Sequence, residues 1–458
     1  MPTAEVVPEA TVSTPVAEHS AGDSSDVEEA SQRYSLASTR PPDDRPEHDA
    51  ARLAELGIHR YASRRLVLYS DIDPAVAAGL PSLVDAIFPA WETYFGRLPP
   101  AEDGSDFQLT GYLMRDRGLF RECGLLPEDL IEFEHGRHRG YQFWMNEQSF
   151  DYYRRHLLLH EATHCYMLIP PTTARPPLFY LEGMAELFGT HRIDAKSKVE
   201  FRTMPADPSV DIGFGRIEMI RSAIAAGELE TFGDVLEIDA QDFAASRSLP
   251  YAWSWAMCKF LDTHPRYRER FRELAPIAEG NEFRRAMRAA FADDLPHLAI
   301  EWELFTTQLE YGFDIERFAI DFVEGTPLPV HAERSFEIAA DRGWQSSGIR
   351  VEAGRTYQIV ADGQVTLAQS PVRWESEPRG VSIEYANGER LGRLRGLLIA
   401  DAPMPAAGMS SLHSIDIGPR RELTPAVTGT LYLRVNDHWS SLADNVRGYR
   451  ITVQATTP

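Results

Sequence analysis

The stretch His160-Glu161-Ala162-Thr163-His164 constrains this 458-residue chain more than any other part of its sequence. On a helix, residues i and i+4 lie one above the other on one face, so the two imidazoles can bind one tetrahedral Zn²⁺ ion. Glu161 lies about 100° further round the helix, beside such an ion. A carboxylate placed there suits a base for the attacking water. The H-E-x-x-H pattern therefore predicts a helix that carries a zinc-hydrolase site.

A dense apolar run precedes this pattern and supports a buried helix. Residues 152–159 contain no Gly or Pro and end in three consecutive leucines. Buried His and Glu side chains need ionic or hydrogen-bond partners. The alternative is an ordinary helix with two surface histidines, and the apolar run argues against that interpretation.

Two glutamates on a second helix are candidates for the third zinc ligand. Pro170-Pro171 ends the first helix, because proline clashes with the preceding turn, and Pro176-Pro177 stands where a new helix can begin. The apolar segment 178–188 then carries Glu182 and Glu186 one helical turn apart. One carboxylate can bind zinc, while the other can accept the free N–H of a ligand imidazole.

This arrangement resembles the gluzincin metallopeptidases, in which an H-E-x-x-H helix is followed by an E-G-x-A-E helix. It is most similar to uncharacterised bacterial gluzincins with H-E-A-T-H, a Pro-rich loop and a hydrophobic E-G-x-A-E helix. The resemblance implies zinc bound by His160, His164 and Glu182, with Glu161 as general base and Glu186 as a carboxylate behind the ligands. The connection before the second helix is one residue shorter than in the common pattern, so both glutamates remain candidates for the third ligand.

Tyr251 is a candidate for a further catalytic group. In several gluzincins a tyrosine at the start of a downstream helix donates a hydrogen bond to the oxyanion, and Tyr251 is similarly placed in the segment 249–261. Charge that develops on a carbonyl oxygen needs a positioned donor. A core aromatic residue at a helix start explains Tyr251 equally well.

Three other histidines lie near the motif in the sequence. His135 and His138 flank Gly136-Arg137 in a predicted loop, where we expect solvent-exposed side chains. His156 lies one turn before His160 on the same helix face, and we expect a packed or capping histidine there.

Composition divides the chain into three parts. Residues 1–46 are rich in Ala, Ser, Pro, Thr and acidic residues, which predicts a disordered tail. Residues 47–325 contain a few strand-like segments and many of helical periodicity, which indicates an α+β domain with a small sheet. After a predicted linker at 325–330, residues 335–458 alternate with period two between glycine-containing turns. That pattern is typical of an all-β sandwich.

Three predicted strands precede the motif helix, at 65–70, 106–114 and 140–146, and residues 74–95 are predicted to form one long amphipathic helix. In gluzincins the strand in the third position runs along the cleft edge and pairs with extended substrate. The resemblance implies that role for 140–146, since an edge strand can accept a peptide through main-chain hydrogen bonds. An ordinary sheet strand is the alternative.

The C-terminal part resembles the calcium-dependent galactophilic lectins of bacteria over roughly residues 335–456. The resemblance implies that Asp437, Asp444 and Asn445, which are hard oxygen donors, bind a Ca²⁺ ion that bridges carbohydrate hydroxyls. An additional tyrosine ligand of the lectins has no clear counterpart here. Asn and Asp also populate hairpin loops because they tolerate turn conformations, which is the alternative explanation.

Charge and composition exclude several classes of function. A net charge of −23 with no basic cluster makes the chain a poor nucleic-acid binder. Three cysteines without a C-x-x-C predict no disulfide framework. We find no apolar run of eighteen or more residues and no secretory signal, which predicts no transmembrane helix and favours the cytoplasm. The lectin-like part instead favours secretion or the cell surface.

The sequence thus predicts a zinc-dependent metallohydrolase, most simply a peptidase, acting on a peptide or protein substrate. Two alternatives remain open: a non-catalytic protein that binds zinc or glycans, and a zinc hydrolase of another amide or an ester. A glutamate directly after the first zinc histidine favours an enzyme, because a protein that only binds has no need of a base.

Overall fold

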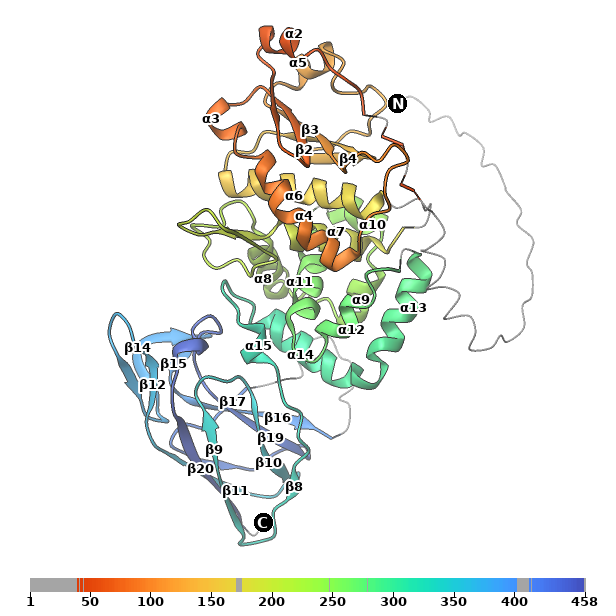
Figure 1. Ribbon diagram of the computed structural model, residues 1–458. Helices are drawn as coiled ribbons and strands as arrows, with labels where there is room; N and C mark the ends of the chain where they lie inside the picture. The colour runs from red at the N-terminus through yellow and green to blue at the C-terminus, as the bar shows by residue number, and fades with distance from the viewer. Residues whose placement is uncertain are drawn as a thin grey trace, which may run out of the picture.

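The computed structural model describes residues 39–40, 42–43, 45–169, 175–246, 248–277, 279–401, 412 and 414–456. Most of the predicted tail at 1–46 and the proposed helix end at Pro170-Pro171 lie outside the described residues. Figure 1 shows mixed α and β structure, with a sheet and its helices at the top, a helical part in the middle and a β-rich part at the bottom.

The N-terminal sheet has the strand order β1-β2-β3-β5-β4. Strands β2, β3 and β5 are parallel, and β1 and β4 are antiparallel to their neighbours. The three predicted strands correspond to β2, β3 and β5. The strand bounds are β1 His59–Ala62, β2 Leu66–Ser70, β3 Leu109–Met114, β4 Gly136–Arg139 and β5 Gln142–Asn146.

The expectation that 140–146 runs along the edge of the sheet is wrong. Strand β5 lies between β3 and β4, and β4 is the edge strand. Gly140, with φ of 58°, starts the tight turn that folds β4 back onto β5. A positive φ is accessible to glycine because it has no Cβ, so Gly140 is part of a hairpin turn and not of a strand.

Residues 74–95 form two helices, α3 (Pro74–Ala77) and α4 (Pro81–Phe95), because Pro81 has no N–H to continue the first one. Among the described residues, this segment is long and apolar enough to cross a membrane by length and composition alone, which core helices also satisfy. Of the 18 residues that meet these criteria, 44% are buried inside the protein, so the expectation of no transmembrane helix is not overturned. Leu83, Ile87 and Trp91 belong to the core, as in a helix that covers a sheet.

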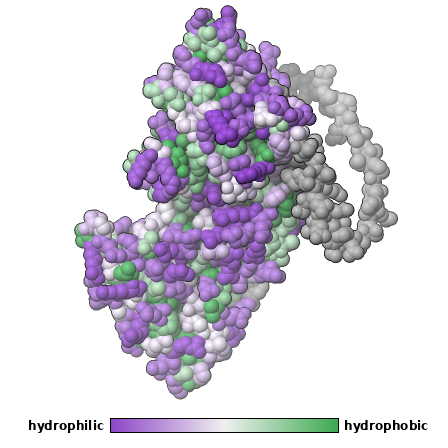
Figure 2. All heavy atoms as spheres, in the orientation of Figure 1, coloured by the Kyte–Doolittle hydropathy of each residue, from purple (hydrophilic) through white to green (hydrophobic). Residues whose placement is uncertain are grey.

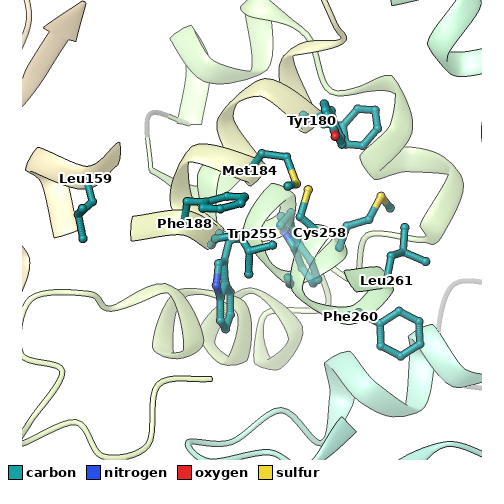
Figure 3. Packing of buried hydrophobic residues seen from close by; sticks show 14 of the residues in the cluster. Leu159, Tyr180, Met184, Phe188, Trp255, Cys258, Phe260 and Leu261 are labelled. Atoms are coloured by element: carbon teal, nitrogen blue, oxygen red, sulfur yellow. The ribbon is translucent and has the colours of Figure 1, made fainter. Parts of the chain in front are cut away.

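A helical part follows the sheet, and α6, α7 and α11 pack at its centre. Gly183 of α7 permits this packing, because a Cβ there would lie 2.5 Å from the Ser254 carbonyl oxygen of α11. Figure 3 shows Met184 of α7 directed toward Cys258 of α11. The remaining bounds are α2 Ala50–Glu55, α5 Arg117–Glu122, α6 Asp151–Leu168, α7 Leu178–Gly189, β6 His191–Ile193, β7 Val199–Phe201, α8 Arg216–Ala225, α9 Phe232–Glu237, α10 Ala240–Ser246, α11 Leu249–Thr263, α12 Arg268–Arg272, α13 Gly280–Phe291, η1 Ala292–Asp294, α14 Leu295–Thr307 and α15 Ile315–Phe318.

The β-rich part contains a five-stranded sheet, β17-β16-β19-β10-β8, and a four-stranded sheet, β18-β11-β20-β9, around a separate apolar core. The predicted linker at 325–330 is in part a strand, since Thr326–Pro327 pairs with β10. The bounds are β8 Thr326–Pro327, β9 Glu333–Ala339, β10 Gln345–Val351, β11 Tyr357–Asp362, β12 Val365–Ala368, β13 Trp374–Ser376, β14 Val381–Ala386, β15 Glu389–Leu391, β16 Leu394–Ala400, β17 Ser414–Asp416, β18 Arg420–Leu423, β19 Gly429–Val435, η2 Leu442–Asp444 and β20 Gly448–Ala455.

Trp439, in the loop after β19, joins the helical and β-rich parts. It is fully buried, and its ring packs on those of Phe313 and Phe318, at centroid distances of 5.2 and 5.1 Å. Its Nε1 donates a hydrogen bond to the side-chain oxygen of Gln308. In Figure 2 the surface is mainly hydrophilic, and it is hollowed on the left between these two parts.

Candidate functional site

Helices α6 and α7 bring three predicted ligand side chains together. The Nε2 atoms of His160 and His164 lie 3.0 Å apart, and Oε2 of Glu182 lies 3.4 Å from the first and 3.1 Å from the second. A tetrahedral zinc ion with bonds of about 2.0–2.1 Å needs ligand atoms roughly 3.3 Å apart. The three donor atoms therefore have the chemistry and the spacing of a zinc site with one open position.

A second group of metal-capable side chains shares His160 and adds His156 and Glu186. Glu186 Oε1 lies 3.6 Å from Nδ1 of His160, on the other side of the ring from Nε2. Arg216 donates to both oxygens of Glu186, and His156 Nε2 donates to Oε2 at 3.1 Å. Glu186 is thus placed behind the ligand imidazole, whereas Glu182 faces both Nε2 atoms.

A glycine of α7 sets the approach of α7 to this part of α6. A Cβ at Gly189 would lie 2.7 Å from Cε1 of His156, so a larger residue would push the imidazole away from Glu186. His156 itself is fully enclosed, and it lies one turn before His160. The expectation of a packed histidine at this position is confirmed by its burial, whereas its bond to Glu186 was not predicted.

Glu161 follows His160 on α6, interacts with the charges of His160 and His164, and contacts the edge strand β4. His138 Nδ1 lies 3.2 Å from Glu161 Oε2, and the His138 ring lies 4.4 Å from the His164 ring. A Cβ at Gly136 would lie 2.4 Å from Glu161 Oε1. Residues two apart on a strand share a face, so Gly136 and His138 both face α6. The expectation that His138 is a solvent-exposed loop residue is therefore wrong.

The pKa values of the site reflect burial opposed by opposite charge. Burial raises the pKa of Glu161, but the hydrogen bond from His138 and the charge of His160 leave it below its ordinary value. Burial would lower the pKa of His160, but its bond to Glu182 and the charge of Glu186 raise it to about 9. Glu161 thus stays a carboxylate able to accept a proton, and a proton competes with a metal ion for His160.

Tyr251 lies in the first turn of α11, near the ligand cluster. Its ring centroid is 6.3 Å from that of His160, and the Arg216 guanidinium lies 5.8 Å from its ring. Burial, followed by the charges of Glu182 and Glu186, raises the pKa of Tyr251. The phenol therefore keeps its proton and can donate it in a hydrogen bond.

Arg216 is a site residue that the sequence did not reveal. It is buried at the start of α8, after Gly215, whose φ is 64°. A single arginine at a helix start matches no motif, and its partner Glu186 is 30 residues away in the chain. The E-G-x-A-E pattern signalled a second carboxylate but not the cation that balances it.

The structure brings two of the three predicted calcium residues together. Asp437 Oδ2 accepts a hydrogen bond from Asn445 Nδ2 at 2.9 Å, and Oδ1 accepts one from the His438 N–H at 2.8 Å. Asp444 is exposed, and its carboxylate accepts from the Gln369 backbone N–H at 3.4 Å. Among the described residues, the groups of three His, Cys, Asp or Glu that can hold a metal both lie on α6 and α7. Calcium and carbohydrate binding here stay predictions.

Comparisons with known proteins leave the family of the chain open. No family model matches the chain, and no curated protein matches it. Among solved structures, a domain described as "EclA N-terminal domain; PllA-like lectin" is 17% identical, with a TM-score of 0.21. The match covers 26% of this chain and 94% of that domain. A likeness of this size carries no argument about function. Because no family model and no curated protein matches the chain, the gluzincin prediction rests on the motif residues.

Proposed function

We propose that this protein is a zinc-dependent hydrolase that cleaves peptide bonds. The observation that carries the proposal is the triangle formed by two Nε2 atoms and Glu182 Oε2, together with a Glu161 carboxylate that interacts with the charges of both histidines. His160, His164 and Glu182 would hold the ion, and Glu186 would orient the His160 ring. Zinc, when bound, supplies a Lewis acid that polarises the carbonyl and lowers the pKa of water.

The residues around the ion have separate tasks in the proposed reaction. Glu161 accepts a proton from the attacking water and passes it to the leaving amine. Tyr251, which keeps its proton, donates a hydrogen bond to the oxygen on which negative charge develops. One carboxylate thus moves the proton, while a phenol stabilises charge.

The edge strand β4 is the proposed place for the substrate backbone. Strand β4 pairs with β5 on one side and ends the sheet on the other. An extended peptide can add to such an edge through main-chain hydrogen bonds. Because β4 also contacts Glu161, a peptide on this edge would lie next to the base. The role expected for 140–146 therefore passes to 136–139.

Metal content and peptide cleavage, measured on the same preparations, test the proposal. We expect one zinc per chain in the wild type and in Glu161→Gln, with cleavage of a mixed peptide library lost only in the latter. Glu182→Ala should lose zinc, whereas Glu186→Ala should keep it with affinity reduced about 10- to 100-fold. Zinc lost equally from both variants would contradict the ligand assignment.

Other outcomes separate the alternative functions. Zinc without peptide cleavage, followed by hydrolysis of other amides or esters, would change the substrate class and keep the site. A wild-type protein without zinc would remove the enzyme proposal and leave a binding function, including glycan binding by the β-rich part. Full activity of Glu161→Gln would remove the role of that glutamate.

A further inference from the structure

Strand β4 supplies two contacts to the same carboxylate. His138 Nδ1 lies 3.2 Å from Glu161 Oε2, and Gly136 leaves the space that Glu161 Oε1 fills. Both positions face α6 across the edge of the sheet, and α6 bears the motif. Nothing in the H-E-x-x-H pattern requires such a partner strand.

We propose that His138 is a positioning residue for Glu161, which it holds beside the zinc ligands through a hydrogen bond from Nδ1. The inference rests on the proposed function, because it takes Glu161 to be the base. A carboxylate offers only acceptors, so Nδ1 must carry the proton in this bond.

The surroundings fix the direction of this bond. The His138 side chain is 21% exposed, whereas that of Glu161 is 6% exposed. The His138 ring lies against the His164 ring, at a centroid distance of 4.4 Å and an interplanar angle of 31°, which limits its rotation. The backbone of β4 is in turn held to β5 by the register His138 to Phe143. The ring contact and the strand pairing thus orient Nδ1 of His138 toward Glu161.

A buried glutamate needs such a donor. Glutamate has several rotatable bonds, and ordering its side chain costs conformational entropy that a contact must offset. A buried carboxylate that loses its partner also bears a desolvation cost and can rotate toward solvent or toward the metal ion. The bond from His138 opposes both movements.

Amide substitutions that mimic one ring nitrogen test the bond. The amide nitrogen of Asn occupies nearly the position of Nδ1, and that of Gln the position of Nε2. We expect His138→Ala and His138→Gln to lower kcat about 10- to 100-fold with KM and chelator-competed zinc affinity nearly unchanged. His138→Asn should restore most of kcat. The exposed His135→Ala is the matched control and should behave as wild type.

A double-mutant cycle separates positioning from a general structural effect. In the Glu161→Gln background the base is already lost, so His138→Ala should reduce residual turnover no further. An equal loss in both backgrounds would overturn the proposal, as would His138→Asn no better than His138→Ala, or a loss of zinc in all three His138 variants.

A spectroscopic measurement tests the bond without turnover. In protein with ¹⁵N-labelled histidine and zinc bound, the Nδ1–H proton of His138 should be protected from exchange, and its resonance should shift in Glu161→Gln. An Nδ1 without a proton would overturn the proposal. A protected proton in a protein that cleaves no peptide would support the positioning and contradict the proposed function, so the two can fail separately.

Discussion

The ligand cluster on α6 and α7 and the loop 436–445 after β19 were both predicted to hold metal ions, but they differ in where their donor atoms point. In the cluster, two Nε2 atoms and one Glu182 oxygen face a shared space within 3.4 Å of one another. In the loop, both oxygens of Asp437 accept hydrogen bonds from the protein itself. In the first region three donor atoms thus face one space, whereas in the second the Asp437 oxygens bond to the protein and Asn445 Oδ1 is buried without a hydrogen-bond partner.

The difference follows from the backbone that carries each set. A helix fixes the direction of side chains four residues apart, so a motif on a helix predicts geometry as well as residue type. A loop fixes no such direction, and Asn and Asp are frequent in loops because they satisfy nearby backbone groups. Motif residues are therefore stronger evidence for a site on a helix than in a loop.

The loop also has another task, which is to join the two parts of the molecule. His438 Nδ1 lies 3.3 Å from Oε2 of Glu310 in the helical part, and Ser440 N donates to Oε1 of the same residue. The Arg434 guanidinium lies 3.7 Å above the Trp439 ring and donates to the Asp437 carbonyl oxygen. The polar residues of the loop thus support an internal interface.

The largest contrast should appear in metal affinity. Because His164 contributes one of three proposed ligands, His164→Ala should lower zinc affinity by more than the roughly 10- to 100-fold typical of residues behind the ligands. Asp437→Ala should leave zinc affinity unchanged. Chelator competition with the purified proteins measures both affinities. Equal zinc affinities in the two variants would contradict the difference drawn here between the cluster and the loop.

The next effect concerns the interface around Trp439, between the helical and β-rich parts. Trp439→Ala removes a fully buried indole from the interface, so we expect a loss of roughly 3–5 kcal/mol in the free energy of unfolding. Urea denaturation followed by tryptophan fluorescence and circular dichroism measures it. If the helical and β-rich parts of Trp439→Ala unfold in separate transitions, the Trp439 interface couples them in the wild type. An unchanged unfolding midpoint would contradict the role of Trp439. Val427→Ala, at an exposed position in the same part, is the control.

A smaller effect should come from Gly136. A methyl group there would lie 2.4 Å from Glu161 Oε1, so Gly136→Ala should displace the carboxylate while the three ligands remain in place. We expect kcat to fall about 10- to 100-fold with one zinc per chain retained. Turnover and elemental analysis of the same sample test this. Wild-type turnover would mean that Glu161 does not depend on β4.

The smallest effect is a pH dependence in the loop. Burial raises the pKa of Asp437 to about 6 from an ordinary value of 3.8, even though Asn445 and the His438 N–H donate to it. Between about pH 4 and 6 the folded residue holds a proton that the unfolded chain has lost, so stability should fall as pH rises through this range. Asp437→Asn should remove that part of the slope, as measured by urea unfolding at several pH values.

Repeating this measurement with added Ca²⁺ tests whether Asp437 binds the ion. An ion bound at Asp437 would hold its carboxylate in the charged form, and the slope would disappear when Ca²⁺ is added. We expect the slope to persist, since both carboxylate oxygens accept hydrogen bonds within the protein. A slope abolished by Ca²⁺, together with a raised unfolding midpoint, would instead support the predicted calcium site.

Periodicity and punctuation predicted much of the fold, and the exceptions have local causes. The strands at 65–70 and 106–114 and the motif helix were found because their patterns extend over a whole element. The single helix predicted over 74–95 is two helices because of Pro81, and the edge strand was missed because Gly140 was assigned to the strand after it. At both positions a proline or glycine, and not the apolar pattern, determined where an element begins or ends.

The candidate site divides in the same way. His160, His164 and the two glutamates of α7 could be found because short spacings on helices place them. His138 and Arg216 could not, since each meets its partner from a distant element, 23 and 30 residues away in the chain. Contacts of that kind depend on how the sheet and helices pack, which no local pattern in one sequence encodes.

The edge position of β4 has a consequence for selectivity among substrates. The outermost strand of a sheet is held on one flank only, so its fluctuations pass directly to the His138 side chain that it bears. A peptide long enough to pair along that flank would reduce the motion of the strand, and a short peptide would not. Long and short substrates would then differ in turnover as well as in binding. This is a form of induced fit in which the length of the substrate acts through its pairing with β4.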